Sequence, residues 1–235
     1  MPDMIFKSLA SSSAGNAYIV DDGATKILIE CGLTYKKLQK LAGFSLSEFR
    51  ACLLTHEHKD HSKCVQDLLV RGMDVYMSYG TAEALELEQA QIIEAMEQFK
   101  VGSLDIVPFA VFHDAKEPLG FLIKSREDGD VLAFATDTVN IRYKFPGLNI
   151  LAIEANYDRD ILDRSEKLPD KTKDRITKTH MEIDTLCDYL QSLDLSACRE
   201  IHLLHLSDAM SREGEFIQMV KNVVPDNIRV TACEK

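Results

Sequence analysis

The stretch Thr55-His56-Glu57-His58-Lys59-Asp60-His61 holds three of the chain's seven histidines within six residues. It follows a short apolar run, residues 51–54, that predicts a buried strand. Imidazole and carboxylate groups are the ligands that zinc and its first-row neighbours prefer. The alternative is a surface loop that is rich in histidine by chance, but close groups of His and Asp are typical of metal or catalytic sites. The stretch therefore predicts a metal site at the end of a strand.

Alternation of side chains divides this stretch between two metal positions. In an extended turn, His56 and His58 project to the same side of the chain and can share one metal. Asp60 and His61 then turn toward a second position. The stretch alone thus offers ligands to two ions.

Three further candidate ligands, His113, Asp137 and His205, stand at the ends of predicted strands. Each alone is more often a turn residue, but with the quoted stretch they make five histidines and two aspartates, enough for two metals. Two ions about 3.5–4 Å apart, bridged by Asp137, would suit in-line attack on a phosphodiester. His202 lies three residues before His205, so it points to the opposite strand face and is predicted not to bind metal.

The bulk composition is that of an ordinary globular protein. The chain has 235 residues, of which 46% are hydrophobic and 28% charged, and we expect a single domain over residues 1–235. The first ten residues lack a basic stretch followed by an apolar run, and no apolar segment approaches the ~20 residues of a membrane span. The six cysteines are scattered without a close pair, as in reduced proteins. These features favour a cytoplasmic protein without a membrane partner.

Hydrophobic periodicity predicts strands, then helices, then strands, then helices. Helices are expected from Tyr35 and over residues 64–69, 82–99, 183–190 and 216–223. Strands are expected over residues 5–9, 17–20, 26–29, 51–54, 106–111, 120–123, 131–135, 150–153 and 200–205. This order indicates two similar halves with sheets packed inside and helices outside.

The quoted stretch is the His-x-His-x-Asp-His signature of the metallo-β-lactamase superfamily, and nearly the whole chain resembles the YycJ/WalJ-like branch, which is related to ribonuclease Z-type phosphodiesterases. The resemblance continues in order through Ser11-Ser12-Ser13-Ala14-Gly15-Asn16-Ala17, His113-Asp114-Ala115-Lys116-Glu117-Pro118, Thr136-Asp137-Thr138, Glu154-Ala155-Asn156-Tyr157-Asp158 and His205-Leu206-Ser207. It implies an α+β fold, a four-layer αββα sandwich, with two divalent transition-metal ions. Zinc or manganese is expected, with iron as a further candidate.

The resemblance also implies how the ligands are shared. The first metal would take His56, His58 and His113. The second would take Asp60, His61 and His205, and Asp137 would bridge the two. Asp60 would in addition act in catalysis by accepting a proton from the attacking water.

His180 is the second candidate catalytic residue. The run Thr179-His180-Met181-Glu182 stands where related phosphodiesterases carry a Gly-His motif whose histidine is held to be catalytic. The spacing of Thr179 and Glu182 also reads as a capping box, which predicts His180 at a helix N-terminus beside a bound phosphate, donating a proton to the leaving oxygen. The alternative is that only the two capping residues matter.

Three residues depart from the family pattern. Glu30 stands where the family usually has Asp, and is expected to support a ligand histidine from behind. Tyr157 replaces the His of an Asn-His-Asp motif, and Thr179 replaces the Gly before His180. All predicted metal ligands are present, so these departures bear on the choice of substrate.

The leading function is a metal-dependent nuclease or phosphodiesterase acting on nucleic acid, and the resemblance implies a DNA exonuclease. A net charge of −11 argues against tight, non-specific binding of nucleic acid, although seven basic residues gather among acidic ones over residues 159–178. One alternative is a hydrolase of a small phosphodiester such as a cyclic nucleotide, which the acidic charge suits. Another is a non-catalytic nucleic-acid-processing partner that keeps its metals for structure.

Overall fold

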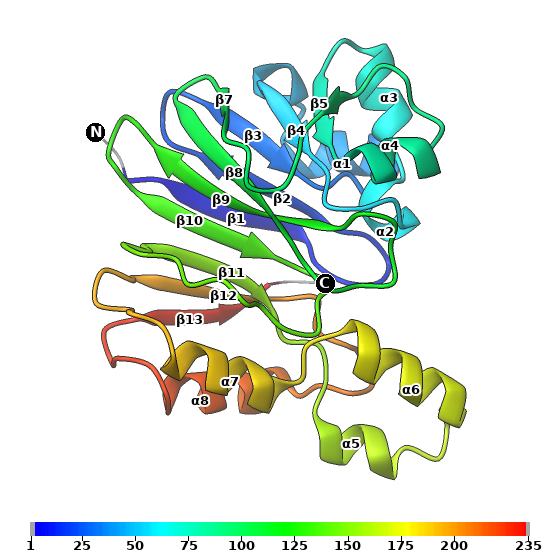
Figure 1. Cartoon of the computed structure of the whole chain (residues 1–235), viewed down its shortest axis with the longest axis vertical. Coiled ribbons are helices and arrows are strands. Elements are labelled where there is room, and N and C mark those ends of the chain that lie inside the picture. The colour runs from blue at the N-terminus through cyan, green and yellow to red at the C-terminus, as the bar shows by residue number, and fades with distance from the viewer. Residues whose placement is uncertain (1–2, 234–235) are drawn as a thin grey trace. The chain divides into compact units, whose positions relative to one another are not determined.

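The computed structural model describes residues 3–233, which fold into two compact units (Figure 1). Unit 1 comprises residues 3–110 and Ala115–Val131. Unit 2 comprises Val111–Asp114 and Leu132–Cys233. Within these residues, no helix combines the length and the apolar character that crossing a bilayer requires.

Unit 1 contains a six-stranded sheet whose strands are ordered as in the sequence. Its first three strands pair antiparallel and the remaining pairs are parallel. The strands are β1 (Ile5–Ala10), β2 (Ala17–Asp21), β3 (Lys26–Ile29), β4 (Ala51–Leu53), β5 (Asp74–Met77) and β6 (Gln91–Ile92). The parallel connections carry α1 (Tyr35–Leu41), a 3-10 turn (Leu46–Glu48), α2 (Lys59–Ser62), α3 (Val65–Val70) and α4 (Tyr79–Ala84).

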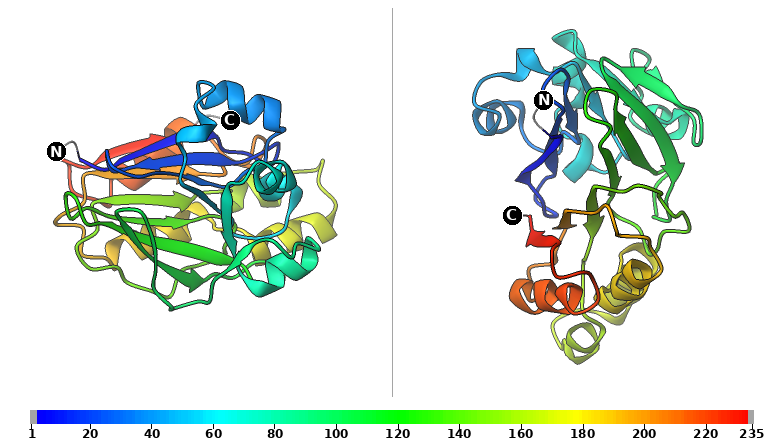
Figure 2. Two further views of the ribbon diagram at one scale, coloured as in Figure 1. Left: turned by 90° about the horizontal axis from the view of Figure 1, so that it is seen from above. Right: turned by 90° about the vertical axis from the view of Figure 1, so that its left-hand side faces the viewer.

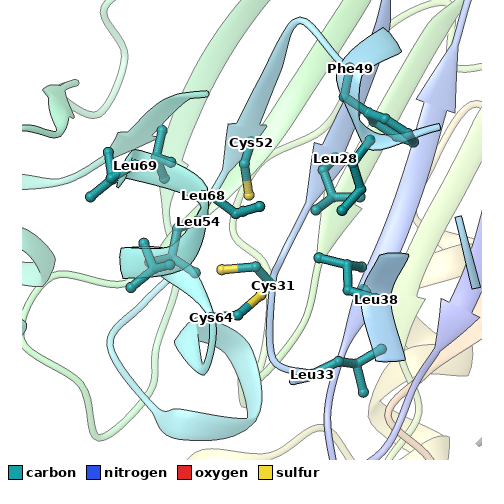
Figure 3. Packing of buried hydrophobic residues seen from close by; sticks show 14 of the residues in the cluster. Leu28, Cys31, Leu33, Leu38, Phe49, Cys52, Leu54, Cys64, Leu68 and Leu69 are labelled. Atoms are coloured by element: carbon teal, nitrogen blue, oxygen red, sulfur yellow. The ribbon is translucent and has the colours of Figure 1, made fainter. Parts of the chain in front are cut away.

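Apolar side chains of β3 and β4 and of the helices around them form the main core of this sheet (Figure 3). Cys31, Cys52 and Cys64 point toward one another there, among the leucines of α1 and α3. All six cysteines are buried, and none forms a disulfide within the described residues. Buried thiols here act as small hydrophobic side chains.

Unit 1 also holds an antiparallel ladder of β7 (Phe99–Val101), β8 (Leu104–Ala110) and β9 (Leu119–Ser125). A buried carboxylate fastens it to the turn between β2 and β3. Asp22 Oδ2 accepts hydrogen bonds from Ser103 Oγ at 2.6 Å and Ser125 Oγ at 2.9 Å. Both hydroxyls are therefore satisfied inside the unit.

Unit 2 is built on parallel strands with helical connections. The strands are β10 (Val131–Ala135), β11 (Ile150–Glu154), β12 (Glu200–Leu204) and β13 (Arg229–Ala232). The helices are α5 (Arg159–Arg164), α6 (Asp170–Thr179), α7 (Ile183–Gln191) and α8 (Glu213–Lys221). Figure 2 shows α7 and α8 lying side by side beneath these strands. Every residue of β11 is buried, as parallel strands covered on their faces require.

The predicted strands are all present, with ends within two residues of the predicted ones. The helix predicted over residues 82–99 is wrong. Only α4 reaches into that range, and the chain then enters β6 and β7, with Glu86 and Met96 in the left-handed region. Pairing of Ile92 with Met77, and of Phe99 with Ile106, overrides the helix preference of this Glu-rich segment.

The basic stretch of residues 159–178 is largely helical. It contains α5 and α6, and Ile161, Leu168 and Ile176 pack against a buried apolar cluster of Tyr157, Leu162 and Met210. Tyr157 thus stands in the core at the position where the family pattern has His, outside the candidate site.

Candidate metal centre

In unit 1 the histidine-rich stretch forms a sharp turn between β4 and α2. All three residues of β4 are buried, and the chain then runs to His58, which begins α2 with an extended backbone. Ser62 Oγ donates to the carbonyl oxygen of Glu57 at 2.8 Å, which closes the turn. The short helix therefore presents Asp60 and His61 just after His56 and His58.

The predicted ligands of this stretch lie close together. Ligand atoms of His56 lie within 4.8 Å of those of both His58 and His61, and so do those of Asp60 and His61. The ring centroids of His56 and His58 are 4.7 Å apart, and those of His56 and His61 are 4.2 Å apart. His56 and His61 are buried, whereas the Asp60 side chain is 26% exposed and so can meet a substrate or solvent.

Buried partners orient the two inner rings. Thr55 Oγ1 donates to Glu30 Oε1, so its lone pair is left to accept from His56 Nδ1 at 2.8 Å. Glu30 Oε1 also lies 3.3 Å from His61 Nδ1. A proton on each Nδ1 directs the lone pair of Nε2 outward, as a metal ligand requires. The position of Glu30 agrees with the supporting role expected for it.

A close approach between backbone segments holds α2 against the loop that contains Asn16. The carbonyl oxygen of Asp60 accepts from the backbone N–H of Asn16 at 2.8 Å, and Gly32 N donates to Asn16 O at 2.9 Å. A Cβ on Gly32 would lie 1.6 Å from the Asp60 oxygen, so only glycine fits. The Ser/Gly-rich loop therefore serves to position the ligand turn.

In unit 2, four side chains converge from the ends of strands and helices. Ligand atoms of Asp137, Glu154, His180 and His205 all lie within 4.8 Å of one another. His205 Nδ1 is 2.9 Å from Asp137 Oδ1 and 3.3 Å from Glu154 Oε1. His180 Nδ1 is 2.7 Å from Glu154 Oε1 and 3.2 Å from Asp137 Oδ1. The structure thus brings together three residues that the sequence singled out.

Glu154 is the member that the sequence analysis did not assign to the site. It is fully buried, and its Oε2 accepts from the backbone N–H groups of Thr138 at 2.9 Å and Met181 at 3.1 Å. Its signal was available, because it ends the apolar run of β11 just as His205 follows that of β12.

His180 is not at a helix N-terminus, and the predicted capping box is wrong. Thr179 is the last residue of α6, His180 caps its C-terminal end, and α7 begins at Ile183 with Glu182 as its cap. Thr179 Oγ1 instead donates to the carbonyl oxygen of Arg175 at 2.8 Å. This hydrogen bond, from residue i to residue i−4, belongs to the last turn of α6, which precedes His180 in the chain. The capping-box spacing does not indicate that preceding helix.

The two buried carboxylates beside His180 determine the direction in which its pKa shifts. Burial lowers the pKa of His180, but the Glu154 and Asp137 carboxylates outweigh it and raise the pKa to about 9. The side chain remains 15% exposed.

His113, from the short segment Val111–Asp114, is held beside this group. Its Nδ1 donates to the carbonyl oxygen of Thr179 at 2.9 Å, and its ring centroid is 5.3 Å from that of His180. Its side chain is only 2% exposed, and burial lowers its pKa, which favours the neutral form that binds metal.

His202 has other partners than the candidate ligands. Its Nε2 lies 2.9 Å from Glu200 Oε2 and its Nδ1 lies 3.1 Å from Thr231 Oγ1. Within residues 3–233, it belongs to none of the groups that could hold a metal. That His202 is not a ligand stays a prediction.

The donor set in each unit fits a divalent transition metal. Unit 1 offers three imidazoles and an aspartate on one turn, and unit 2 offers imidazoles beside two buried carboxylates. Buried carboxylates only 3 Å or so from imidazoles are costly unless positive charge balances them. Mixed nitrogen and oxygen ligands of this kind suit zinc and its neighbours.

Comparison with known proteins agrees with this chemistry. A family model described as the beta-lactamase superfamily domain matches residues 25–205. The exodeoxyribonuclease WalJ of Streptococcus pneumoniae is 30% identical over 221 residues, which cover 86% of this chain and 81% of the relative. The exodeoxyribonuclease YycJ of Bacillus anthracis is 30% identical over 223 residues, covering 86% and 82%. The anti-Pycsar protein Apyc1 of Saccharibacillus brassicae is 27% identical over 209 residues, covering 82% and 83%.

Solved structures share the fold at low sequence identity. The metallo-β-lactamase fold protein YhfI of Bacillus subtilis superposes with a TM-score of 0.76 at 16% identity, over 99% of this chain and 97% of that one. The short form of human tRNase Z gives a TM-score of 0.61 at 15% identity, over 98% and 96%. The predicted fold class, mixed α and β with two sheets and the metallo-β-lactamase fold, is confirmed. The chain belongs to the β-lactamase superfamily and is homologous to the WalJ and YycJ exodeoxyribonucleases.

Proposed function

We propose that this chain is a metal-dependent exodeoxyribonuclease. The observation that carries the proposal is its 30% identity to two named exodeoxyribonucleases over 86% of its length. The ligand clusters of the two units support hydrolysis, because each offers the donors of a divalent metal site. We further propose that the two units work as one hydrolase domain, since each carries part of the ligand set.

The proposed ligands are the seven predicted ones, and the proposed cofactors are two divalent ions, zinc or manganese. Bound ions would supply Lewis acidity, polarising the phosphodiester and lowering the pKa of the attacking water. The ligands are His56, His58, Asp60, His61, His113, Asp137 and His205. Hydrogen bonds from the Nδ1 atoms support the set, since they leave Nε2 for the metal; the acceptors are Thr55 Oγ1 for His56, the Thr179 carbonyl for His113 and Glu154 Oε1 for His205.

Two residues are proposed to move protons. Asp60 is a partly exposed carboxylate of the histidine-rich turn, at 26%, and would take a proton from water. His180 is tied through Nδ1 to Glu154 and Asp137, and its partly exposed ring can donate through Nε2 to the leaving oxygen. The two carboxylates hold the ring in place and stabilise its charged form.

A second candidate is a hydrolase of a small phosphodiester such as a cyclic nucleotide. The net charge of −11 favours it, because a large negative charge opposes the approach of a long polyanion more than that of a nucleotide. It needs the same metal ligands and differs only in what the surface around them accepts.

One experiment on purified chain loaded with manganese or zinc tests the proposal. We expect release of nucleotides from a linear DNA with free ends, little action on a closed circular DNA or an RNA, and about two metal ions per chain by elemental analysis. Asp60→Ala should abolish hydrolysis. Turnover of cyclic nucleotides with DNA left intact would favour the second candidate, and metal content near zero would contradict both.

A further inference from the structure

One face of α6 is basic and turned away from the core of unit 2. Lys171, Arg175 and Lys178 are exposed and recur at i, i+4 and i+7, so they share one side of the helix. Ile176 lies on another side and packs against the apolar cluster around Tyr157. The packing of the helix therefore fixes which side chains it presents outward.

This face forms the wall of a groove in unit 2. The groove has a volume of about 370 Å³ and is lined by Asp114, Lys171, Asp174, Arg175, Lys178 and Thr179. One water molecule occupies roughly 30 Å³ in the liquid, so the groove has room for a group much larger than water. Three of its six lining residues are cationic and two are acidic, so the groove keeps a small positive charge in a chain whose net charge is −11.

The groove is linked directly to a proposed metal ligand. Arg175 Nε donates to Asp114 Oδ2 at 2.7 Å, and Asp114 Oδ1 lies 3.3 Å from His113 Nε2. Thr179, at the end of the same helix, accepts from His113 Nδ1 through its carbonyl oxygen at 2.9 Å. An anion held in the groove would therefore lie next to the place where His113 binds metal.

Two of the cations are available to an anion. Arg175 is engaged with Asp114, but neither Lys171 nor Lys178 forms an ion pair with any residue between positions 3 and 233. Their Cα atoms are seven residues apart on a helix, or about 10 Å along its axis. Successive phosphates of one DNA strand rise about 3.4 Å each, so the two lysines span more than one phosphate.

We propose that this groove binds the phosphate backbone of a DNA strand beside the nucleotide being removed. The inference rests on the proposed function for its substrate class, and it adds a substrate-binding site to the metal ligands. Lys171 and Lys178 contact phosphates, and the Asp114–Arg175 pair couples the groove to His113. Binding here is local, so it is compatible with a strongly acidic chain.

The test neutralises both lysines in the metal-loaded full chain, as Lys171→Gln with Lys178→Gln. The matched control is Lys36→Gln with Lys40→Gln on α1, which removes the same charge from two exposed lysines of unit 1. Binding of a fluorescent phosphorothioate DNA, which resists cleavage, is followed by anisotropy across a salt series. Exposed charge pairs predict about a 2- to 30-fold weaker Kd for the α6 variant.

The salt series gives the sharper readout. Each lost phosphate contact should reduce the slope of log K against log salt by about 0.7 for a single strand or 0.9 for a duplex, so the α6 variant should lose about 1.4 to 1.8. The α1 variant should keep the slope and Kd of the unaltered chain. An unchanged slope in the α6 variant, or equal losses in both variants, would overturn the inference. Hydrolysis of bis(4-nitrophenyl) phosphate and of DNA by the unaltered chain reports separately on the proposed function.

Discussion

Replacing Glu154 by Gln should weaken metal binding without changing the size of the side chain. In the native chain the carboxylate only accepts: Oε1 faces Nδ1 of His180 and His205, and Oε2 faces two backbone N–H groups. A proton is thereby kept on each Nδ1, which leaves Nε2 of His205 for the proposed metal and Nε2 of His180 for proton donation. An amide can accept on one side only, and its NH2 group must face the other pair of donors.

The orientation of the amide that has the lower free energy would impair metal binding. The backbone donors of Thr138 and Met181 cannot change, whereas a neutral imidazole can move its proton from Nδ1 to Nε2. The NH2 group of the introduced amide would therefore face the two histidines. His205 would then carry Nε2–H and lose the lone pair that the proposed metal site uses. Loss of such a supporting partner typically lowers metal affinity about 10–100-fold, or about 1.4–2.8 kcal/mol.

Competition with a chromophoric chelator measures this affinity directly. Glu200→Gln is the matched control, because Glu200 lies on the neighbouring strand and contacts His202 and Arg229 but no proposed ligand. We expect the control to bind metal as the unaltered chain does. Metal affinity of Glu154→Gln within about twofold of the unaltered chain would refute the argument that Glu154 sets the protonation of His205.

Two further predictions concern the histidines. His202→Ala should leave the metal content unchanged, whereas His205→Ala should lose occupancy of one ion, as elemental analysis would show; the reverse pattern would reassign the ligand. His180→Ala should keep both ions but slow the cleavage of DNA, a substrate with a poor leaving group, by about 10²–10⁴-fold. A nitrophenyl phosphodiester, whose leaving group needs little protonation, should be affected much less, and equal slowing of both substrates would contradict the acid role.

Strand-end reasoning predicted much of the site because ligand type and backbone direction are both local properties. His56, His58, His113 and His205 could be singled out since each follows an apolar run. The partners that orient them could not, because contacts such as Glu30 with His61 join residues far apart in the chain. Glu154 also ends an apolar run, but its contacts with His180 and His205 join residues 26 and 51 positions apart in the chain.

Helix boundaries were the weaker part of the prediction. The Thr-x-x-Glu spacing before Ile183 fits a capping box. Thr179 instead lies in the last turn of α6, where its hydroxyl donates to a carbonyl of that helix. Likewise the Glu-rich residues 82–99 have good helix formers but give up the helix for pairing with β5 and β8. In both places a partner distant in sequence decided between two locally acceptable conformations.

Three residues that end strands at the candidate site adopt a backbone conformation that side chains disfavour. Glu30, Asp137 and His205 have φ angles of 67°, 47° and 52°. Such conformations cost roughly 1–3 kcal/mol each, and glycine would adopt them without that penalty. Stability and the proposed metal binding therefore make opposite demands at these three positions. Selection of variants for thermal tolerance alone should favour glycine or asparagine at these positions. The selected proteins should gain stability and lose the proposed metal binding.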